Sequence, residues 1–152
     1  MKKTIAYPLT ILYYLLFGTT LGVFHLLQVF SFRVFGYSAH KKTVDWMNFF
    51  LIRYLNFLGT HIVFEQPFKL PKGRPLIIVS NHQSTYDIPP IIWYLRKFHP
   101  KFISKKELGK GIPSVSYNLK HGGSVLIDRQ QPEEALELIK AFAQKIEQKK
   151  WS

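Results

Sequence analysis

Residues 80–87, with the sequence SNHQSTYD, bring an imidazole, several hydroxyls and a carboxylate into one short stretch. His82 and Asp87 are separated by four residues. A carboxylate that accepts a hydrogen bond from one imidazole nitrogen fixes the tautomer of the ring, so that the other nitrogen can accept a proton. The spacing therefore indicates a general base with its orienting acid, and the simplest nucleophile for such a base is a substrate hydroxyl.

Other interpretations of the same residues stay open on spacing alone. Asp87 can be the N-cap of the following helix, and His82 can be an ordinary loop histidine. Ser84 and Thr85 are candidate nucleophiles, although neither lies in a G-x-S-x-G elbow.

The elements on either side place this loop at the edge of a sheet. Residues 76–79 are an apolar, β-branched run, which predicts a strand covered on both faces. Asp87 opens a helix with Pro89 and Pro90 in its first turn, where no amide donor is needed. Loops at the carboxyl ends of strands are where α/β sheets place ligands, so His82 lies at a suitable position.

The rest of the chain after residue 60 reads as alternating strands and helices. Further strands are predicted at residues 61–65, 102–104 and 125–127, and further helices at residues 112–120 and from Pro132 onward. The apolar stripe of the last helix consists of Ala135, Ile139, Phe142, Ala143 and Ile146. The pattern predicts an α/β fold with crossover helices. Because the chain stops just after a helix, we expect the sheet to be incomplete.

The N-terminal segment predicts membrane association. Residues 4–32 carry no formal charge and would form a helix about 43 Å long at about 1.5 Å per residue. The apolar core of a bilayer is about 30 Å thick, so the segment can span with a tilt, or break at Pro8 or at Gly18 and Gly22. A signal peptide is not indicated, because the apolar run is too long and lacks a convincing cleavage site. The alternative is a buried helix of a soluble protein.

A second apolar stretch, residues 44–64, is interrupted by Asp45, Arg53 and His61. Its aromatic residues, mixed with a cation, suit the headgroup level better than the bilayer centre. A helical hairpin seated in one leaflet therefore fits as well as a single span. We expect a membrane-anchoring helical segment at residues 1–60 and an α/β catalytic domain at residues 61–152.

The composition fits one folded domain with a strong positive charge. The 152 residues are 47% hydrophobic and 16% aromatic, and 21 basic against 9 acidic residues give a net charge of +12. Such a field attracts phosphates, nucleotide cofactors, anionic lipid surfaces or nucleic acid, but no nucleic-acid-binding motif is recognised. The lack of cysteine excludes disulfides, thiolate catalysis and cysteine-based zinc sites, and His61, His99 and His121 show no metal-like spacing.

Two motifs and their spacing resemble a known family. Residues 81–87, NHQSTYD, resemble the NHx4D signature of the glycerolipid acyltransferases, the 1-acyl-glycerol-3-phosphate acyltransferase family. Residues 123–129, GSVLIDR, resemble the second block of this family, G-x-x-F-I-D-R, with Leu126 in place of Phe. The resemblance covers roughly residues 60–130. It implies a glycerolipid acyltransferase-like sheet with crossover helices, preceded by the membrane-associated hairpin.

The resemblance implies acyl transfer from an acyl-CoA or acyl-carrier-protein thioester to the hydroxyl of lysophosphatidic acid, giving phosphatidic acid. It assigns His82 as the base and Asp87 as its orienting acid. Arg129 would bind the acceptor phosphate, the alternative being an ion pair with Asp128. Further candidate substrate-binding residues are Lys105, Lys106 and Gly123. For the two lysines a solvated face is the alternative.

The third block of the family, F-P-E-G-T-R, is absent and would follow Ser152, so we expect a truncated chain with only part of the acceptor site. No cofactor or metal is expected. The expected partners are membrane lipids, lysophosphatidic acid and acyl-CoA or acyl-carrier protein, without nucleic acid, and the active site is expected on the cytoplasmic face of the membrane. The alternatives are a non-catalytic lipid-surface or scaffold protein and an acyltransferase for another lipid alcohol.

Overall fold

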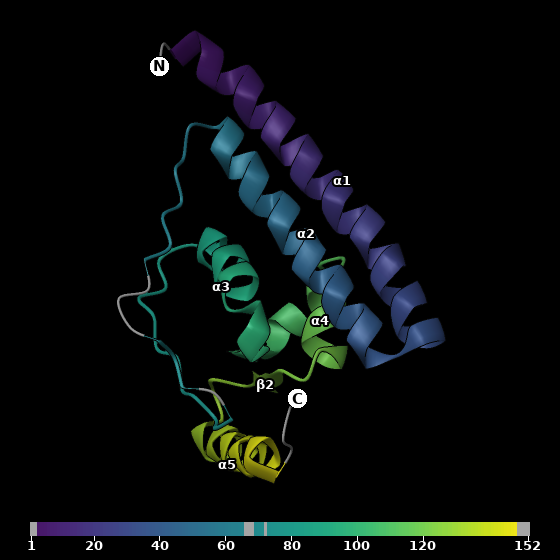
Figure 1. The fold of residues 1–152 in the computed structure, drawn as a ribbon, viewed down its shortest axis with the longest axis vertical. Coiled ribbons are helices and arrows are strands. Elements are labelled where there is room, and N and C mark those ends of the chain that lie inside the picture. Colours follow the sequence, from purple (N-terminus) through teal and green to yellow (C-terminus); the bar gives the residue numbers. More distant parts are fainter. Residues whose placement is uncertain (1–2, 66–68, 72, 149–152) are drawn as a thin grey trace.

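The structure is a computed structural model that describes residues 3–65, 69–71 and 73–148 (Figure 1). Its helices are α1 (Lys3–Phe35), α2 (Tyr37–Phe57), α3 (Ile88–Tyr94), α4 (Val115–His121) and α5 (Pro132–Gln148), and its strands are β1 (Ile103–Lys105) and β2 (Val125–Ile127). Short 3₁₀ turns occur at Thr85–Asp87, Arg96–Phe98 and Lys106–Gly109. The described chain is therefore a helical hairpin followed by a small α/β unit.

Helices α1 and α2 form the helical hairpin that the sequence predicts, packing side by side in opposite directions (Figure 1). They are joined at Gly36, whose φ of 77° lies in the left-handed region that glycine adopts without strain. The breaks considered at Pro8, Gly18 and Gly22 do not occur, and α1 is continuous. Pro8 lies near the helix start and removes one backbone hydrogen bond, while a helical glycine costs only about 1 kcal/mol relative to alanine.

A small apolar core joins the hairpin to the rest of the chain. Leu21 of α1 and Met47 and Leu51 of α2 are buried at its centre. Partly buried side chains packed against this centre are Phe17, Phe24, Tyr54, Ile112 and Val115. Since the last two belong to the turn before α4 and to α4 itself, the hairpin and the α/β unit share one core.

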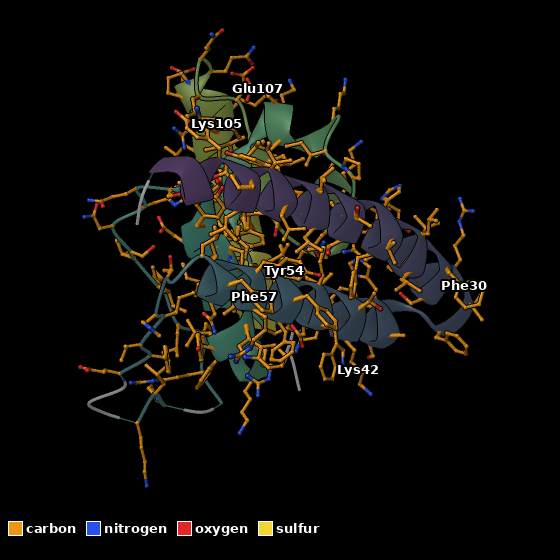
Figure 2. All side chains as sticks on the ribbon, turned by 90° about the horizontal axis from the view of Figure 1, so that it is seen from above. Phe30, Lys42, Tyr54, Phe57, Lys105 and Glu107 are labelled. Atoms are coloured by element: carbon orange, nitrogen blue, oxygen red, sulfur yellow. The ribbon has the colours of Figure 1, made fainter. Side chains whose placement is uncertain are left out.

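One face of α1 is apolar and exposed. Leu15, Leu26 and Phe30 are 63%, 70% and 59% exposed. Phe30 projects at the turn end of the hairpin, away from Lys105 (Figure 2). Among the described residues one segment, Ala6–Phe35, is long and apolar enough to cross a membrane, with a mean hydropathy of 1.6. An exposed apolar face of this extent marks a contact with protein or lipid.

The strands β1 and β2 are parallel, with Ser104 aligned to Leu126. Helix α4 provides the crossover between them and ends at His121, with Gly122 as its C-cap, and Gly123 follows with a φ of 83°. Strand β2 lies where the sequence predicts it, and β1 starts and ends one residue later than expected. All three predicted helices of the α/β unit are present, with α4 starting three residues later than expected.

The predictions of strands at residues 61–65 and 76–79 are wrong. Residues 61–65 and 76–79 belong to no strand, and the sheet of the described chain has two strands. Ile77 and Val79 are 95% and 89% exposed, so this run is not covered on both faces. A strand needs a hydrogen-bonded neighbour from elsewhere in the fold, and β-propensity measures how well side chains suit a covered sheet, not whether such a neighbour is present.

The apolar stripe predicted on α5 is only partly covered. Ala135 is buried, but Phe142 and Ile146 are partly exposed and Ala143 is exposed. Helix α5 packs on β2 and stands apart from the hairpin at the far end of the molecule (Figure 1). Contact with β2 therefore covers only part of the apolar stripe of α5.

Candidate active site

The loop that carries the predicted base is held by its own side chains. Ser84 is the N-cap of the turn Thr85–Asp87, and its hydroxyl accepts a hydrogen bond from the Tyr86 amide at 3.2 Å. The Asp87 carboxylate accepts the Ser84 amide at 2.8 Å, which completes a capping box. Helix α3 then starts at Ile88 with proline in its first turn, as the sequence predicts.

The same carboxylate faces the imidazole. Asp87 Oδ2 lies 3.2 Å from His82 Nδ1. It also accepts hydrogen bonds from the Gln83 and Ser84 amides, each at 2.8 Å. These backbone bonds and then the imidazole hold the pKa of the Asp87 carboxyl below its ordinary value, so the group is ionised at neutral pH. When Nδ1 donates to the carboxylate, Nε2 presents a lone pair. The geometry therefore suits a base with its orienting acid, while Asp87 also fills the capping role that was the alternative.

The His82–Asp87 pair is partly exposed to solvent, and the adjacent Tyr86 packs against the helical hairpin. The side chains of His82 and Asp87 are 56% and 34% exposed, so a substrate can reach the imidazole. Tyr86 packs edge-on against Tyr13 of α1, with the ring centroids 5.8 Å apart. Because Tyr13 is only 5% exposed, this contact anchors the loop to α1.

The predicted phosphate-binding side chains lie at or just after the carboxyl ends of β1 and β2. Lys105 is aligned with Ile127, so Lys106 and Asp128 leave the sheet side by side, with 4.0 Å between Nζ and Oδ2. Arg129 is exposed. Within the described residues, the ion pair considered between Arg129 and Asp128 is not formed.

Gly123 has a φ of 83°, which lies in the left-handed region that favours glycine, so it has a structural role. A Cβ at this position would be strained, and it would stand 3.4 Å from Lys101 Cε and Nζ. Glycine therefore lets the chain turn from α4 into β2 beside Lys101.

The candidate residues form two groups. One is the imidazole–carboxylate pair, and the other is the cationic edge of the sheet. Across the part of the chain that is described, no hydrogen bond or ion pair joins the first group to the second. Their catalytic and substrate-binding roles stay predictions.

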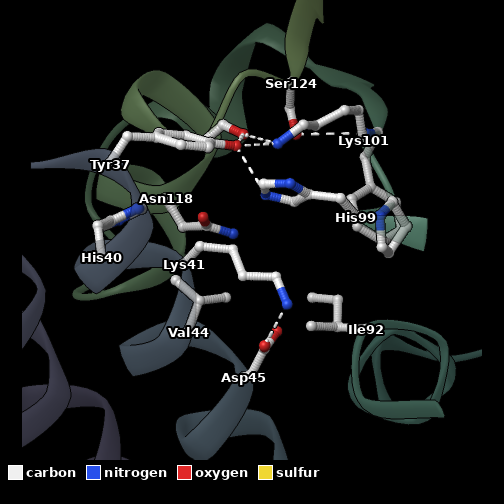
Figure 3. Close-up of a pocket in the computed structure, with 13 residues that line it drawn as sticks. Tyr37, His40, Lys41, Val44, Asp45, Ile92, His99, Lys101, Asn118 and Ser124 are labelled. Carbon is white, nitrogen blue, oxygen red and sulfur yellow. Dashed lines mark hydrogen bonds and ion pairs between the residues drawn. The ribbon is translucent and has the colours of Figure 1, made fainter. Parts of the chain in front are cut away.

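A partly buried polar cluster that the sequence did not indicate lies between α2 and the segments before β1 and β2 (Figure 3). The Tyr37 hydroxyl donates to the Gly122 carbonyl at 3.0 Å and lies 2.8 Å from His99 Nε2. Lys101 Nζ donates to the same carbonyl at 2.6 Å and to the Tyr37 hydroxyl. The cluster ties the first turn of α2 to the segment before β1 and to the end of α4.

Burial dominates the ionisation of this cluster. It lowers the pKa of Lys101 to about 8 and that of His99 to about 4, and it raises the pKa of Tyr37 to about 12. In the same cavity, Lys41 forms a 2.5 Å salt bridge with Asp45 (Figure 3). Because Tyr37 lies 62 residues before His99 in the sequence, no local spacing could have revealed the cluster.

Comparison with known proteins gives the family. Residues 61–151 match the family model described as Acyltransferase. The chain therefore belongs to the acyltransferase family. A stretch of 75 residues is 41% identical to the 1-acyl-sn-glycerol-3-phosphate acyltransferase of Helicobacter pylori strain J99, a match that covers 47% of this chain and 30% of the length of that relative. No solved structure matches the chain.

Proposed function

We propose that the protein transfers an acyl group from an acyl-CoA or acyl-carrier-protein thioester to the free hydroxyl of 1-acyl-glycerol-3-phosphate, giving phosphatidic acid. The observation that carries this proposal is the 3.2 Å contact between His82 Nδ1 and Asp87 Oδ2. Family membership supports acyl transfer, and the name of the relative supports the choice of acceptor.

In this mechanism His82 Nε2 takes the proton of the acceptor hydroxyl while the hydroxyl oxygen attacks the thioester carbonyl. The Asp87 carboxylate keeps Nδ1 protonated and stabilises the imidazolium that forms. When the tetrahedral intermediate collapses, the carbon–sulfur bond breaks and the imidazolium returns the proton to the leaving thiolate. One ester bond replaces one thioester bond, and the imidazole is regenerated.

For the acceptor phosphate we assign the cationic edge of the sheet. The exposed guanidinium of Arg129 can hold a phosphate through two parallel hydrogen bonds. Lys105 and Lys106 add positive charge, although Asp128 lies 4.0 Å from Lys106 and offsets part of it. Gly123 is included because it belongs to the same motif as Arg129.

We place the active site at the cytoplasmic surface of a membrane. The exposed apolar face of α1 supports membrane association. Ser114, just before α4, is hydrogen-bonded to the middle of α1. Its hydroxyl donates to the Leu21 carbonyl at 2.8 Å, and its amide donates to His25 Nδ1 at 3.2 Å. A non-helical polar segment of this kind is not accommodated against lipid at mid-bilayer, so a hairpin lying in one leaflet fits better than a span. A cytosolic acyl donor favours the cytoplasmic face.

The test is thioester-dependent acyl transfer to 1-acyl-glycerol-3-phosphate by the full chain in membranes. His82→Ala is expected to lower turnover about 10²–10⁴-fold. The matched control is His61→Ala, which changes an exposed histidine outside the loop and is expected to leave turnover unchanged.

Each other result has a defined meaning. Full turnover by His82→Ala would refute the assignment of the base. Turnover with another lipid alcohol, but not with 1-acyl-glycerol-3-phosphate, would change the acceptor. No turnover by the wild type with any lipid alcohol would favour the second candidate, a non-catalytic lipid-surface or scaffold protein. The observation that favours this candidate is the lack of a described contact between the base and the cationic edge.

A further inference from the structure

A second concave surface lies between α1 and α4. It is a groove of about 460 Å³ that the middle of α1, the turn at residues 109–113 and α4 enclose. Side chains with polar atoms that line it are His25, Lys110, Ser116, Tyr117, Lys120 and His121. None of the described residues that line the groove carries a carboxylate. Its chemistry therefore suits an anion with several acceptor oxygens.

A constrained turn centred on Ser114, next to the groove residue Pro113, is bonded to α1. Ser114 is fully buried, with its hydroxyl on the Leu21 carbonyl and its amide on His25 Nδ1. Its φ is 61°, and the Val115 amide donates to the Pro113 carbonyl at 2.6 Å, which closes a γ-turn around it. Such a turn is strained for a residue with a side chain. The bonds to α1 offset this strain and fix the groove against the hairpin.

Aromatic contacts fix the two histidines of the groove. The His25 ring meets Tyr117 edge-on at 5.7 Å, and Tyr117 packs on His121 at 4.3 Å. Because His25 Nδ1 accepts the Ser114 amide, Nε2 is the ring nitrogen that carries the proton and can donate to a ligand.

Two lysines supply the charge. Lys110 follows the turn Lys106–Gly109, and Lys120 lies in the last turn of α4. Both are exposed, and in the described structure neither forms an ion pair. Two uncompensated ammonium groups with a fixed imidazole donor match the charge and the acceptor oxygens of a phosphate group.

The groove borders the exposed apolar face of α1 and is separate from the His82 loop. His25 adjoins Leu26, which is 70% exposed. Along α1, His25 lies about 18 Å from Tyr13, the residue that contacts the loop, at about 1.5 Å per residue. A ligand in the groove would therefore sit beside lipid if α1 lies in a bilayer surface, and away from the reacting groups.

We propose that this groove binds the phosphate headgroup of an anionic membrane lipid that is not the acyl acceptor, and so fixes the depth and rotation of α1 at the membrane surface. The inference rests on the membrane placement in the proposed function. A lipid is favoured over soluble phosphate because acyl chains attached to the headgroup can extend along the exposed apolar face of α1.

The experiment measures binding of the full chain to phosphatidylcholine vesicles with and without phosphatidic acid. Lys110→Gln combined with Lys120→Gln is expected to weaken binding to the anionic vesicles about thirtyfold, from about fivefold for each basic residue near an anionic surface. Lys140→Gln combined with Lys145→Gln on α5 removes the same charge outside the groove and is expected to weaken binding less than about fivefold. Replacing both groove lysines by arginine keeps the charge and is expected to keep binding.

Four results would overturn the inference. The first is equal loss in the groove and α5 variants, which indicates unspecific attraction. The second is equal loss in the arginine variant, which indicates that the positive charge of the groove does not carry the binding. The third is displacement of the wild type from anionic vesicles by inorganic phosphate at constant ionic strength, which indicates a soluble ligand. The fourth is equal binding of the wild type to both vesicle types. If the wild type also transfers acyl groups in that case, the proposed function stands. If the wild type binds neither vesicle type, the membrane placement itself fails.

Discussion

Replacing Asp87 by asparagine separates the two roles of this side chain. Asp87 Oδ2 accepts two backbone amides at 2.8 Å and lies 3.2 Å from the imidazole. The carbonyl oxygen of asparagine can accept the same two backbone bonds, so the turn Thr85–Asp87 is expected to persist. What is lost is the negative charge beside His82.

Two limits bound the expected loss of turnover in Asp87→Asn. A charge-assisted hydrogen bond is roughly twice as strong as a neutral one, which sets a lower limit of about tenfold. An orienting group cannot contribute more than the base that it orients, so the upper limit is about 10⁴-fold. The two side chains are 56% and 34% exposed, and solvent therefore screens the pair in the free protein. We expect a loss of about 10–10²-fold in kcat/KM.

The assay compares the wild type, Asp87→Asn, His82→Ala and the double variant. If Asp87 acts through His82, the double variant is expected to be no slower than His82→Ala alone. Glu134→Gln, on the exposed side of α5, is the control for loss of a carboxylate and is expected to behave as the wild type. Losses that multiply in the double variant would refute the reasoning, as would an Asp87→Asn protein with unchanged kcat/KM.

Three further predictions concern stability and the acceptor site. Tyr37→Phe removes one of the two donors to the part-buried Gly122 carbonyl and takes away the hydroxyl that Lys101 and His99 contact. It is expected to lower the free energy of unfolding by about 1–3 kcal/mol in urea titrations, while Tyr7→Phe, at a 71% exposed site, changes it by less than about 0.5 kcal/mol. Burial lowers the pKa of His40 and His99 from 6.5 to about 4, so the unfolded chain binds more protons than the folded chain between these pH values. The free energy of unfolding is therefore expected to fall as the pH drops from 6.5 to about 4. An unfolding midpoint that stays constant over this pH range would contradict this prediction. Arg129→Lys loses bidentate geometry and is expected to raise KM for the acceptor about tenfold with little change in kcat, whereas an unchanged KM would remove Arg129 from the acceptor site.

Local sequence patterns were sufficient where neighbours along the chain decide the structure. Pro89 and Pro90 predicted the start of α3. The facing of His82 and Asp87 was also predictable, because the loop between them is short and caps itself. These features depend on interactions within a few residues, which sequence spacing encodes directly.

Features that depend on distant partners were not predictable. Residues 76–79 have the composition of a covered strand, but no described strand pairs with them. The cluster of Tyr37, His99 and Lys101 forms only because the fold brings α2 against the segment before β1. Nothing in the spacing of these three residues distinguishes them from ordinary surface groups.

In the proposed function, the edge-on contact between Tyr86 and Tyr13 couples α1 mechanically to the catalytic loop. Tyr86, the residue before Asp87, packs against α1, and in the proposed placement α1 experiences the lateral pressure of the bilayer. Sliding α1 by a single residue would move Tyr13 by about 1.5 Å, which is enough to tilt an imidazole out of line with an acceptor hydroxyl. In the proposed function, lipid packing and curvature would then tune the rate of acyl transfer.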